Sequence, residues 1–342
     1  MMVQIRFIAS LFVGKKIAEM KLLTKLIRAL SIEFTTISIL AKHGVPDIVL
    51  QFNGGIGDEL LLTTVAFELK KRSPKIKIWQ ISHSHELLQH NPAYHKIFSW
   101  ENWQLRYSQL LRFKTLRLAY AKEIVPKELE APVSSHILSI LCTKAGVTGE
   151  ISLRPYLYLS EDEKLACRQN HKTITVYCLG EHSHISVMKN KIWGAERLQK
   201  VIDALSEKYG SEIEILQIGG KDDPRLNNVT DMRGKTTLRE SAAILSQSIC
   251  CLTTVGLVMH MARAVHCPSV VVYGGREHSW QSGYSGNVNI ESFPECAPCW
   301  KWNECDFERK CMTTISVETV LQGIERLINH PQNELRIDTA VV

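Results

Sequence analysis

Two glycine-rich segments, about two hundred residues apart, constrain the fold of this chain more than any other feature. The first occupies residues 47–59 (DIVLQFNGGIGDE) and the second residues 250–260 (CCLTTVGLVMH). Each follows a short apolar run that we interpret as a buried strand, and each begins a helical pattern. A helix that starts at such a loop directs unpaired backbone N–H groups at whatever lies above it, which favours anions such as diphosphates. The pair predicts two similar domains facing each other across a cleft, with an acceptor on one loop and a phosphate-bearing donor on the other.

Alternating strand and helix patterns support this two-domain interpretation, which also fits a length of 342 residues. In the first half we expect strands at 48–52 and 75–81, separated by a helix at 59–71. In the second half we expect strands at 173–179, 212–218, 249–253 and 269–273, and helices at 195–209, 237–248, 257–265 and 317–328. Such alternation indicates parallel sheets with right-handed crossovers. We therefore predict an α/β protein with an N-terminal segment at 1–44, a Rossmann-like domain at 45–165 and a second at 166–330.

The distribution of charge excludes one broad class of function. Residues 1–44 contain seven of the 41 Lys and Arg but only two of the 35 Asp and Glu, so they carry +5 of the net charge of +6. The rest of the chain is nearly neutral. Because a nucleic-acid-binding protein presents a basic face on its folded body, we expect no nucleic-acid partner.

The N-terminal segment predicts a basic amphipathic helix at 15–32. Apolar residues recur at helical spacing beside a stripe of cations, Lys21, Lys25 and Arg28. This helix either packs on the body or makes a peripheral contact with anionic lipid. The apolar run at 7–14 is too short to span a membrane and lacks a signal cleavage site. Six scattered cysteines at apolar positions suit a reducing compartment, so we expect a cytoplasmic location, at the inner face of the cytoplasmic membrane if the helix binds lipid.

Asp58 ends the first glycine loop, after Gly55 and Gly57, at the start of the expected helix. One interpretation is structural, because a carboxylate in this position caps free N–H groups of the helix. The helix start also stabilises the anion, so Asp58 should stay deprotonated near neutral pH. A deprotonated carboxylate above a glycine loop is therefore also a candidate general base for an acceptor hydroxyl. We expect the two loop glycines to contact substrate.

Four residues of the second half are candidates for donor binding. His260 lies one turn into the helix that follows Gly256, where it is either a buried core histidine or a hydrogen-bond donor to phosphate. Lys191 is either a solvated loop lysine or a cation that neutralises a leaving diphosphate. Gly220 lies in a turn after a strand, which places it to approach a nucleotide base or ribose.

Cys296, Cys299, Cys305 and Cys311 form a C-x2-C-x5-C-x5-C pattern within residues 296–311. Four thiolates this close in sequence can hold Zn or Fe and stabilise a loop that has little core of its own. The alternative is four reduced thiols. Because four protein ligands leave no open position for a substrate, we predict a structural metal and not a catalytic one.

The order of these motifs resembles a known family. GGIGDELLLTT at 54–64 and KKRSP at 70–74 are similar to the opening loop region of the heptosyltransferases, glycosyltransferase family 9. Five later segments look like the family's donor-side motifs in the family's order: KIW at 191–193, GG at 219–220, DMRGKTTL at 231–238, GLVMHMARA at 256–264 and PSVVVYGG at 268–275. The resemblance covers roughly residues 45–330. Many members carry an acidic residue shortly before the histidine, whereas residues 254–260 contain none.

The resemblance implies a GT-B fold, in which two Rossmann-like, doubly wound domains face a central cleft that holds the active site. It implies an inverting transferase that uses no metal or other cofactor for catalysis. Asp58 falls on the family's catalytic-base position, and Lys191 and His260 fall on positions that contact the donor phosphates. The four-cysteine stretch is similar to the iron-binding finger of bacterial autotransporter heptosyltransferases, with shorter spacings.

These features together predict an inverting glycosyltransferase. It would move a sugar, in the family's commonest form heptose from ADP-heptose, to a hydroxyl of a lipopolysaccharide core, a surface glycan or a protein. Two alternatives stay open. One is a nucleotide-sugar 2-epimerase, which acts on the donor without an acceptor, and the other is a nucleotide-sugar-binding protein without catalysis. A dinucleotide oxidoreductase is disfavoured, because no G-x-G-x-x-G motif follows a strand with an acidic residue at the usual distance.

Overall fold

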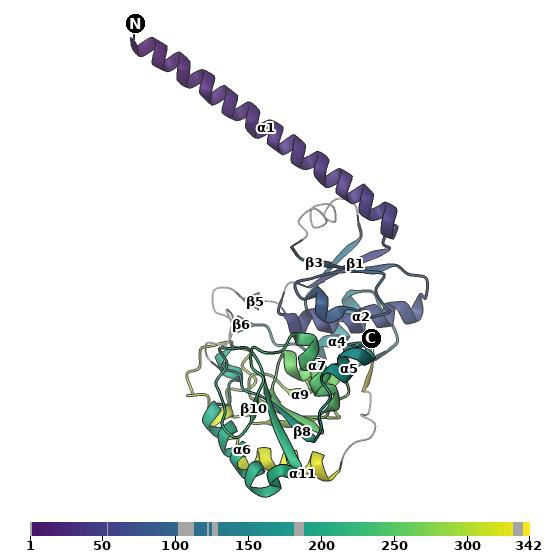
Figure 1. Ribbon diagram of the computed structural model, residues 1–342, viewed down its shortest axis with the longest axis vertical. Coiled ribbons are helices and arrows are strands. Elements are labelled where there is room, and N and C mark those ends of the chain that lie inside the picture. The colour runs from purple at the N-terminus through teal and green to yellow at the C-terminus, as the bar shows by residue number, and fades with distance from the viewer. Residues whose placement is uncertain are drawn as a thin grey trace.

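A computed structural model of the protein describes residues 2–52, 54–101, 113–121, 123–124, 129–180, 188–330 and 338–342, with side chains except at 2–19, 123–124 and 129–130. Two parallel sheets form the body, and a long N-terminal helix extends away from it (Figure 1). The upper sheet in that view comes from the first half of the chain and the lower sheet from the second half.

The upper sheet has the strand order β3-β2-β1-β4, with all neighbouring strands parallel. Its strands are β1 (Ile48–Phe52), β2 (Ile78–Ser82), β3 (Lys96–Ser99) and β4 (Thr115–Leu118). Every residue of β1 and β2 is buried, which is typical of parallel strands covered on both faces. Helix α2 (Ile56–Arg72) connects β1 to β2, α4 (Ile137–Lys144) packs on α2, and a short 3-10 helix, η1 (His85–Leu88), precedes β3.

The lower sheet has the parallel order β10-β9-β8-β11-β12-β13. This is the 3-2-1-4-5-6 order of a Rossmann fold, and the upper sheet repeats its 3-2-1-4 part. The strands are β8 (Lys172–Tyr177), β9 (Ile213–Ile218), β10 (Thr230–Asp231), β11 (Cys250–Thr254), β12 (Ser269–Gly274) and β13 (Val288–Glu291). The main helices are α6 (Ala195–Tyr209), α7 (Leu238–Gln247), α8 (Leu257–Ala264) and α11 (Val317–Asn329).

Shorter elements complete the described chain. They are α5 (Glu161–Ala166), α9 (Ser279–Ser282), α10 (Lys310–Thr313), η2 (Lys189–Lys191), η3 (Gly210–Glu212) and the antiparallel pair β5 (Glu123–Ile124) and β6 (Leu129–Glu130). At the C-terminus, β14 (Thr339–Val341) pairs with β7 (Glu150–Ser152), so the chain returns from the lower half to the vicinity of α4 (Figure 1).

The two halves touch where the glycine-loop helices α2 and α8 pack together. At Gly57, an added Cβ atom would lie 3.3 Å from the Cα atom of Leu257, so the two helix starts are in close contact. A second connection runs through Arg239 of α7, which donates to the carbonyls of Leu87 at 3.1 Å and Tyr158 at 2.7 Å. The glycine loops therefore face each other, as their placement in the sequence predicted.

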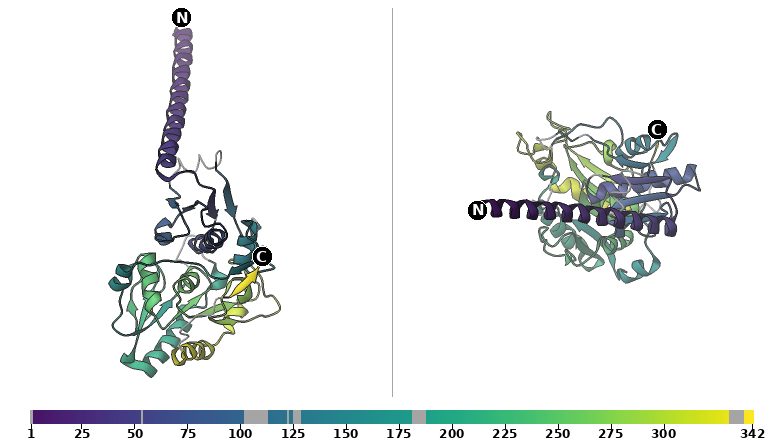
Figure 2. Two further views of the ribbon diagram at one scale, coloured as in Figure 1. Left: turned by 90° about the vertical axis from the view of Figure 1, so that its right-hand side faces the viewer. Right: turned by 90° about the horizontal axis from the view of Figure 1, so that it is seen from above.

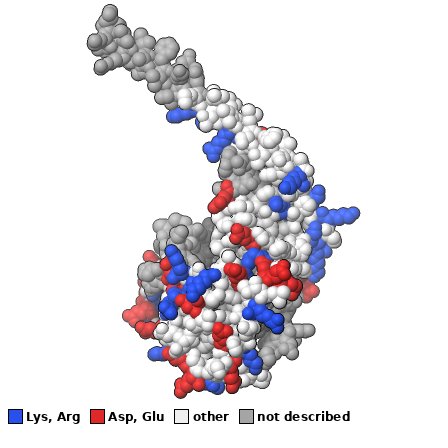
Figure 3. Space-filling model, in the orientation of Figure 1, with Lys and Arg blue, Asp and Glu red and all other residues white. Residues whose placement is uncertain are grey.

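Helix α1 (Met2–His43) projects from the body, as two further views confirm (Figure 2). Its C-terminal part joins the core: Ile39 and Leu40 pack on residues of β1, β2 and β3, and Ile32 and Thr36 are buried. Further out, large apolar side chains are exposed, among them Leu30 at 68% and Phe34 at 76%. Figure 3 shows the described part of this helix as a mainly uncharged surface interrupted by cations.

The interpretation that the predicted helix at 15–32 packs on the body is wrong for the described side chains. Met20, Leu23, Ile27 and Leu30 were expected on a face that packs on the body or meets lipid, and all four are exposed. They do not pack on the body because the helix continues past residue 32 without bending back. In the described residues, no helix is both long and apolar enough to cross a bilayer.

The predicted α/β architecture of two Rossmann-like sheets is confirmed. The predicted strand at 48–52 and the predicted helix at 195–209 match the structure to the residue. The domain limits at 44, 165 and 330 stay a prediction.

Candidate functional site

Both glycine loops lie at the carboxyl ends of strands that flank the switch point of a doubly wound sheet. In the upper sheet that point lies between β1 and β4, and in the lower sheet between β8 and β11. Ligands of open α/β sheets bind in the crevice outside these strand ends. The first loop follows β1 and the second follows β11, so the fold directs both loops to the place where a ligand is expected.

The Asp58 carboxylate is held from two sides. Its Oδ2 atom accepts a hydrogen bond from the backbone N–H of Gly55, the N-cap residue of α2, at 2.9 Å. Its Oδ1 atom accepts from the hydroxyl of Tyr120, which follows β4, at 2.8 Å. The structural interpretation of Asp58 as a capping residue therefore describes its geometry, and the side chain stays partly exposed beside the helix start. Tyr120 adds a restraint that the sequence did not suggest.

Gly57 and Gly256 meet different demands. A side chain at Gly57 would press against the backbone of Leu257 and would lie 3.5 Å from the ring of His260. Gly256, at the N-cap of α8, has open space around a Cβ position, but its φ of +153° is one that other residues rarely adopt. The first glycine allows the two halves to approach, and the second allows the chain to turn into α8.

His260 is buried between the halves, with only 6% of the residue exposed. Its Nδ1 atom is 2.6 Å from the hydroxyl of Tyr284, which also lies edge-on to the imidazole. Burial, assisted by the nearby cation Lys191, lowers the pKa of His260 to about 3. Burial also lowers the pKa of the neighbouring His136 to about 4. At neutral pH both imidazoles are therefore uncharged, and His260 can offer a phosphate a hydrogen bond but no positive charge.

Lys191 forms an ion pair with Glu277, with 2.9 Å between Nζ and Oε1. The lysine side chain is 15% exposed and the glutamate is buried. Burial opposes ionisation of Glu277, but Lys191 and then Arg276 outweigh it and hold the pKa of the carboxyl below its ordinary value. Residues 254–260 contain no carboxylate, and the carboxylate of this pair comes from the segment after β12.

Gly220 does not present a free N–H group. Its backbone nitrogen donates to the Oδ2 atom of Asp223 at 2.7 Å, which closes the turn after β9. Gly220 lies in the lower half. It takes no part in the hydrogen bond between Asp58 and Tyr120 or in the one between His260 and Tyr284.

The four clustered cysteines line one cavity of about 320 Å³, together with Asn190, Gly275 and Arg276. All four thiols are free. Burial, and to a smaller extent the other three thiols, raises the pKa of Cys311. Among the residues the structure describes, no group of three or more His, Cys, Asp or Glu side chains is arranged to hold a metal ion. The predicted closed four-thiolate site is thus not confirmed: the loop brings the thiols to one cavity and not to common ligand distance.

The cysteine loop nevertheless contacts the donor-side cluster. The side-chain nitrogen of Asn190 donates to the carbonyls of Lys301 at 3.2 Å and Glu304 at 2.9 Å, and Arg309 donates to its Oδ1 atom. Asn190 directly precedes Lys191. The loop therefore holds the backbone from which Lys191 reaches Glu277.

Sequence reasoning missed three polar residues of this region, Tyr120, Glu277 and Tyr284. Tyr120 follows a strand that the sequence analysis did not delimit, at the switch point where strand ends matter. Glu277 follows the predicted strand at 269–273, and a charged pair at Arg276 and Glu277 directly after an apolar strand is a usable signal. Tyr284 carries no local signal, because only the packing of α8 brings it to His260.

Two Rossmann-like parallel sheets whose switch points face each other define a two-domain α/β protein of the GT-B class. Residues 143–309 match the family model described as glycosyltransferase family 9 (heptosyltransferase). This part of the chain thus matches the family that the ordered motifs indicated. A comparison with curated proteins found no match.

Solved structures of the same fold support the assignment of the fold. ADP-heptose lipopolysaccharide heptosyltransferase II of E. coli is 14% identical, with a TM-score of 0.61 over 83% of this chain and 98% of that chain. The iron-containing dodecameric glycosyltransferase TibC of enterotoxigenic E. coli is 15% identical, with a TM-score of 0.63 over 84% of this chain and 77% of that chain. A family 9 glycosyl transferase of Veillonella parvula is 15% identical, with a TM-score of 0.59 over 82% and 97%. TibC has also been solved in complex with ADP-D-β-D-heptose.

Proposed function

We propose that this protein is an inverting glycosyltransferase that moves heptose from ADP-heptose to a hydroxyl of a lipopolysaccharide core, a surface glycan or a protein. The main support is the position of Asp58, at the first switch point and across the α2–α8 contact from His260, which lies near Lys191. The family match and the ADP-heptose bound to TibC support the choice of donor. The acceptor belongs to the domain at 45–165 and the donor to the domain at 166–330.

In the proposed reaction, Asp58 accepts the proton of the acceptor hydroxyl while that oxygen attacks the anomeric carbon of the donor. The bond between this carbon and the diphosphate oxygen breaks, and ADP leaves with its electron pair. Lys191 and the N-terminus of α8 stabilise the charge on the leaving diphosphate, and His260 contributes a neutral hydrogen bond. The charge is thus carried by protein groups, and no catalytic metal or cofactor is assigned.

The test is release of ADP from ADP-heptose, measured with and without a lipopolysaccharide preparation and a mixture of cell-surface proteins. Release that depends on an acceptor supports the transferase. Conversion of the donor without any acceptor would favour an epimerase, and tight donor binding without turnover would favour a non-catalytic binder. An Asp58→Asn variant run in parallel excludes release by a contaminating hydrolase.

We also propose that helix α1 contacts the inner face of the cytoplasmic membrane. Its exposed apolar residues alternate with Lys21, Lys25 and Arg28, a combination that suits anionic headgroups. Deletion of residues 1–30 should weaken sedimentation with phosphatidylglycerol vesicles but not with neutral phosphatidylcholine vesicles. Equal binding of the full and shortened proteins to anionic vesicles would refute the contact.

The cysteine loop is proposed to bind one structural Zn or Fe. Four thiols around a single cavity are a suitable donor set, and a cation would offset the burial that disfavours the Cys311 thiolate. Cys296, Cys299, Cys305 and Cys311 would hold the metal and so fix the loop that anchors Asn190. About one metal per chain, lost in a Cys299→Ser/Cys305→Ser variant and kept in Cys167→Ser, would support this proposal. Metal-free wild-type protein with an unchanged melting temperature in chelator would exclude it.

A further inference from the structure

Glu59, next to Asp58 on helix α2, is only 1% exposed, yet its carboxylate is fully used. It accepts hydrogen bonds from the backbone N–H of His83 at 3.0 Å and from the hydroxyl of Ser82. Its Oε1 atom also lies 2.7 Å from Nδ1 of the His83 ring. A buried carboxylate thus fixes both the backbone and the imidazole of the residue that directly follows β2.

The His83 ring is stacked on the indole of Trp100, with 4.4 Å between centroids and 23° between planes. The backbone N–H of Trp100 donates to the carbonyl of Ser82 at 2.8 Å, which fixes the tryptophan beside the end of β2. The His83 side chain is nevertheless 48% exposed. Its Nε2 atom makes no hydrogen bond to any of the residues that the structure describes.

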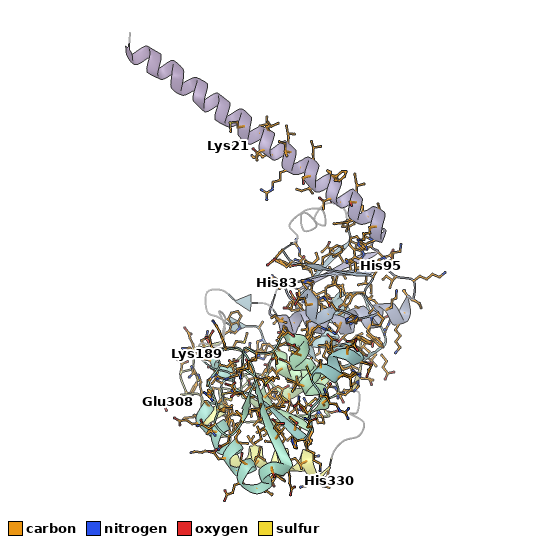
Figure 4. All side chains as sticks on the ribbon, in the orientation of Figure 1. Lys21, His83, His95, Lys189, Glu308 and His330 are labelled. Atoms are coloured by element: carbon orange, nitrogen blue, oxygen red, sulfur yellow. The ribbon has the colours of Figure 1, made fainter. Side chains whose placement is uncertain are left out.

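This pair lies on the substrate side of the upper sheet. His83 follows β2 and Trp100 follows β3, so both lie at the carboxyl edge where Asp58 follows β1 and Tyr120 follows β4. In Figure 4, His83 is labelled on the left of the upper sheet and His95 on its right, and Lys189 is labelled on the left further down. The two rings therefore extend the Asp58 site along the edge of the sheet.

The hydrogen bonds define what the imidazole can recognise. Because a carboxylate can only accept, Nδ1 is the donor in the contact with Glu59, and this tautomer of the imidazole leaves the lone pair on Nε2. A lone pair in a fixed position can accept a hydrogen bond from a ligand hydroxyl group. The two stacked rings add an apolar edge against which the C–H groups of a sugar ring can pack. A hydroxyl-bearing carbohydrate meets both requirements.

We propose that His83 and Trp100, oriented by Glu59, form an acceptor subsite that binds a sugar ring of the acceptor next to Asp58. The inference rests on the proposed function and extends it, since it makes the acceptor a carbohydrate at this position. Nε2 of His83 accepts a hydrogen bond from a ring hydroxyl that is not the reacting one, and Trp100 packs on the ring. Glu59 is a positioning residue.

A purely structural explanation makes a different prediction. If Glu59 only closes the loop after β2, its contacts with the backbone of His83 and Ser84 suffice, and the imidazole and indole have no role in binding. Substitution of the two rings would then change stability at most, and would affect donor and acceptor kinetics alike or not at all.

The first test compares His83→Phe, which keeps a stacking ring but removes Nε2, with Trp100→Phe and with the control His171→Gln at an exposed position of the lower half. With ADP-heptose and lipopolysaccharide, KM for the acceptor should rise about tenfold in His83→Phe, the size expected for one lost hydrogen bond. Trp100→Phe should give a smaller rise in the same constant. KM for ADP-heptose should stay within twofold in all three. An unchanged acceptor KM in His83→Phe, or an equal rise for donor and acceptor, would overturn the subsite.

The second test does not need turnover. Diethyl pyrocarbonate modifies exposed imidazoles, and mass spectrometry can follow His83 and His171 separately. Lipopolysaccharide should protect His83 at least fivefold more than His171. If the wild-type protein transfers no heptose but His83 is protected, the proposed reaction fails and the subsite stands. If transfer occurs without protection, the reaction stands and the subsite is wrong.

Discussion

The two glycine loops have the same local design but different surroundings. The first follows β1 and carries Asp58, a partly exposed carboxylate whose two oxygens bind Gly55 and Tyr120. The second follows β11 and carries His260, a buried and uncharged imidazole bonded to Tyr284. They are not equivalent in their sheets, because β1 is the first strand of its sheet and β11 the fourth strand of the other in chain order.

This difference shows that a sequence motif predicts the position of a residue but not its chemical properties. A strand, a glycine loop and a helix bring a residue to the crevice at a switch point, whichever of the two flanking strands they follow. What the residue can do there depends on the solvent and partners that the rest of the fold supplies. At the first loop the fold leaves a charged group able to meet an acceptor, and at the second it leaves a neutral one beside the Lys191–Glu277 pair.

The sharpest test of this comparison is removal of the charged group at the first loop. Asp58→Asn should lower kcat by about 10²- to 10⁴-fold, the range of general-base catalysis, while the fold persists because the amide oxygen can still accept from Gly55. Steady-state transfer of heptose and the melting temperature measure both effects. Tyr120→Phe is the matched control: it keeps the carboxylate and loses one hydrogen bond, so its kcat should fall less than tenfold. Retained turnover in Asp58→Asn would show that the two loops do not differ in the way described.

The second test concerns the source of positive charge at the second loop. Since His260 is neutral, Lys191 has to carry the charge, and its loss should lower kcat/KM for ADP-heptose by about 10²- to 10³-fold. The variant is Lys191→Met/Glu277→Gln, because Lys191→Met alone would leave a buried carboxylate unpaired and destabilise the protein by about 3–5 kcal/mol. Glu277→Gln serves as the control and should keep most of the donor affinity. Equal activity in the double variant and in this control would remove Lys191 from the donor site.

The smallest expected effect is the pH dependence that the buried imidazole imposes on stability. His260 has a pKa of about 3 in the folded protein, below the ordinary value of 6.5, so the unfolded chain binds more protons as the pH falls below 6.5. This contribution is fully present above that pH and is progressively lost on acidification toward pH 3. At pH 5 the loss should amount to about 2 kcal/mol.

Urea unfolding at pH 7 and pH 5 checks this effect. The loss of unfolding free energy between the two pH values should be about 2 kcal/mol smaller in His260→Gln than in the wild type. His171→Gln, in an exposed position, should match the wild type. An unchanged difference in His260→Gln would mean that the second loop is as open as the first, and the contrast between them would disappear.

Much of the fold was predictable because its signals are local. The mostly apolar run of β1 and the amphipathic pattern of α6 gave boundaries that agree with the structure. The helix expected at 59–71 begins earlier, at Ile56, because the loop residues 56–58 already form its first turn and Asp58 caps it from within. The N-terminal helix was expected over 15–32 and extends over Met2–His43.

The candidate site was only partly predictable, for a physical reason. Asp58, Lys191 and His260 are marked by their places after strands, but Tyr120, Glu277 and Tyr284 approach them through contacts between segments far apart in sequence. The pairing of Lys191 with Glu277 follows from no spacing along the chain. The same holds for His83, which the sequence analysis passed over and which Glu59 orients across 24 positions.

By itself, the sequence determined the class of fold, the position of both glycine loops and the similarity to glycosyltransferase family 9 that the ordered motifs suggested. These depend on short-range rules, since apolar periodicity sets strands and helices, and parallel strands place their following loops at one edge of the sheet. Only the tertiary structure decided which side chains are charged, paired or exposed. Burial and neighbouring charges set those properties, and both arise where α2 meets α8 and where the loop after β12 reaches Lys191.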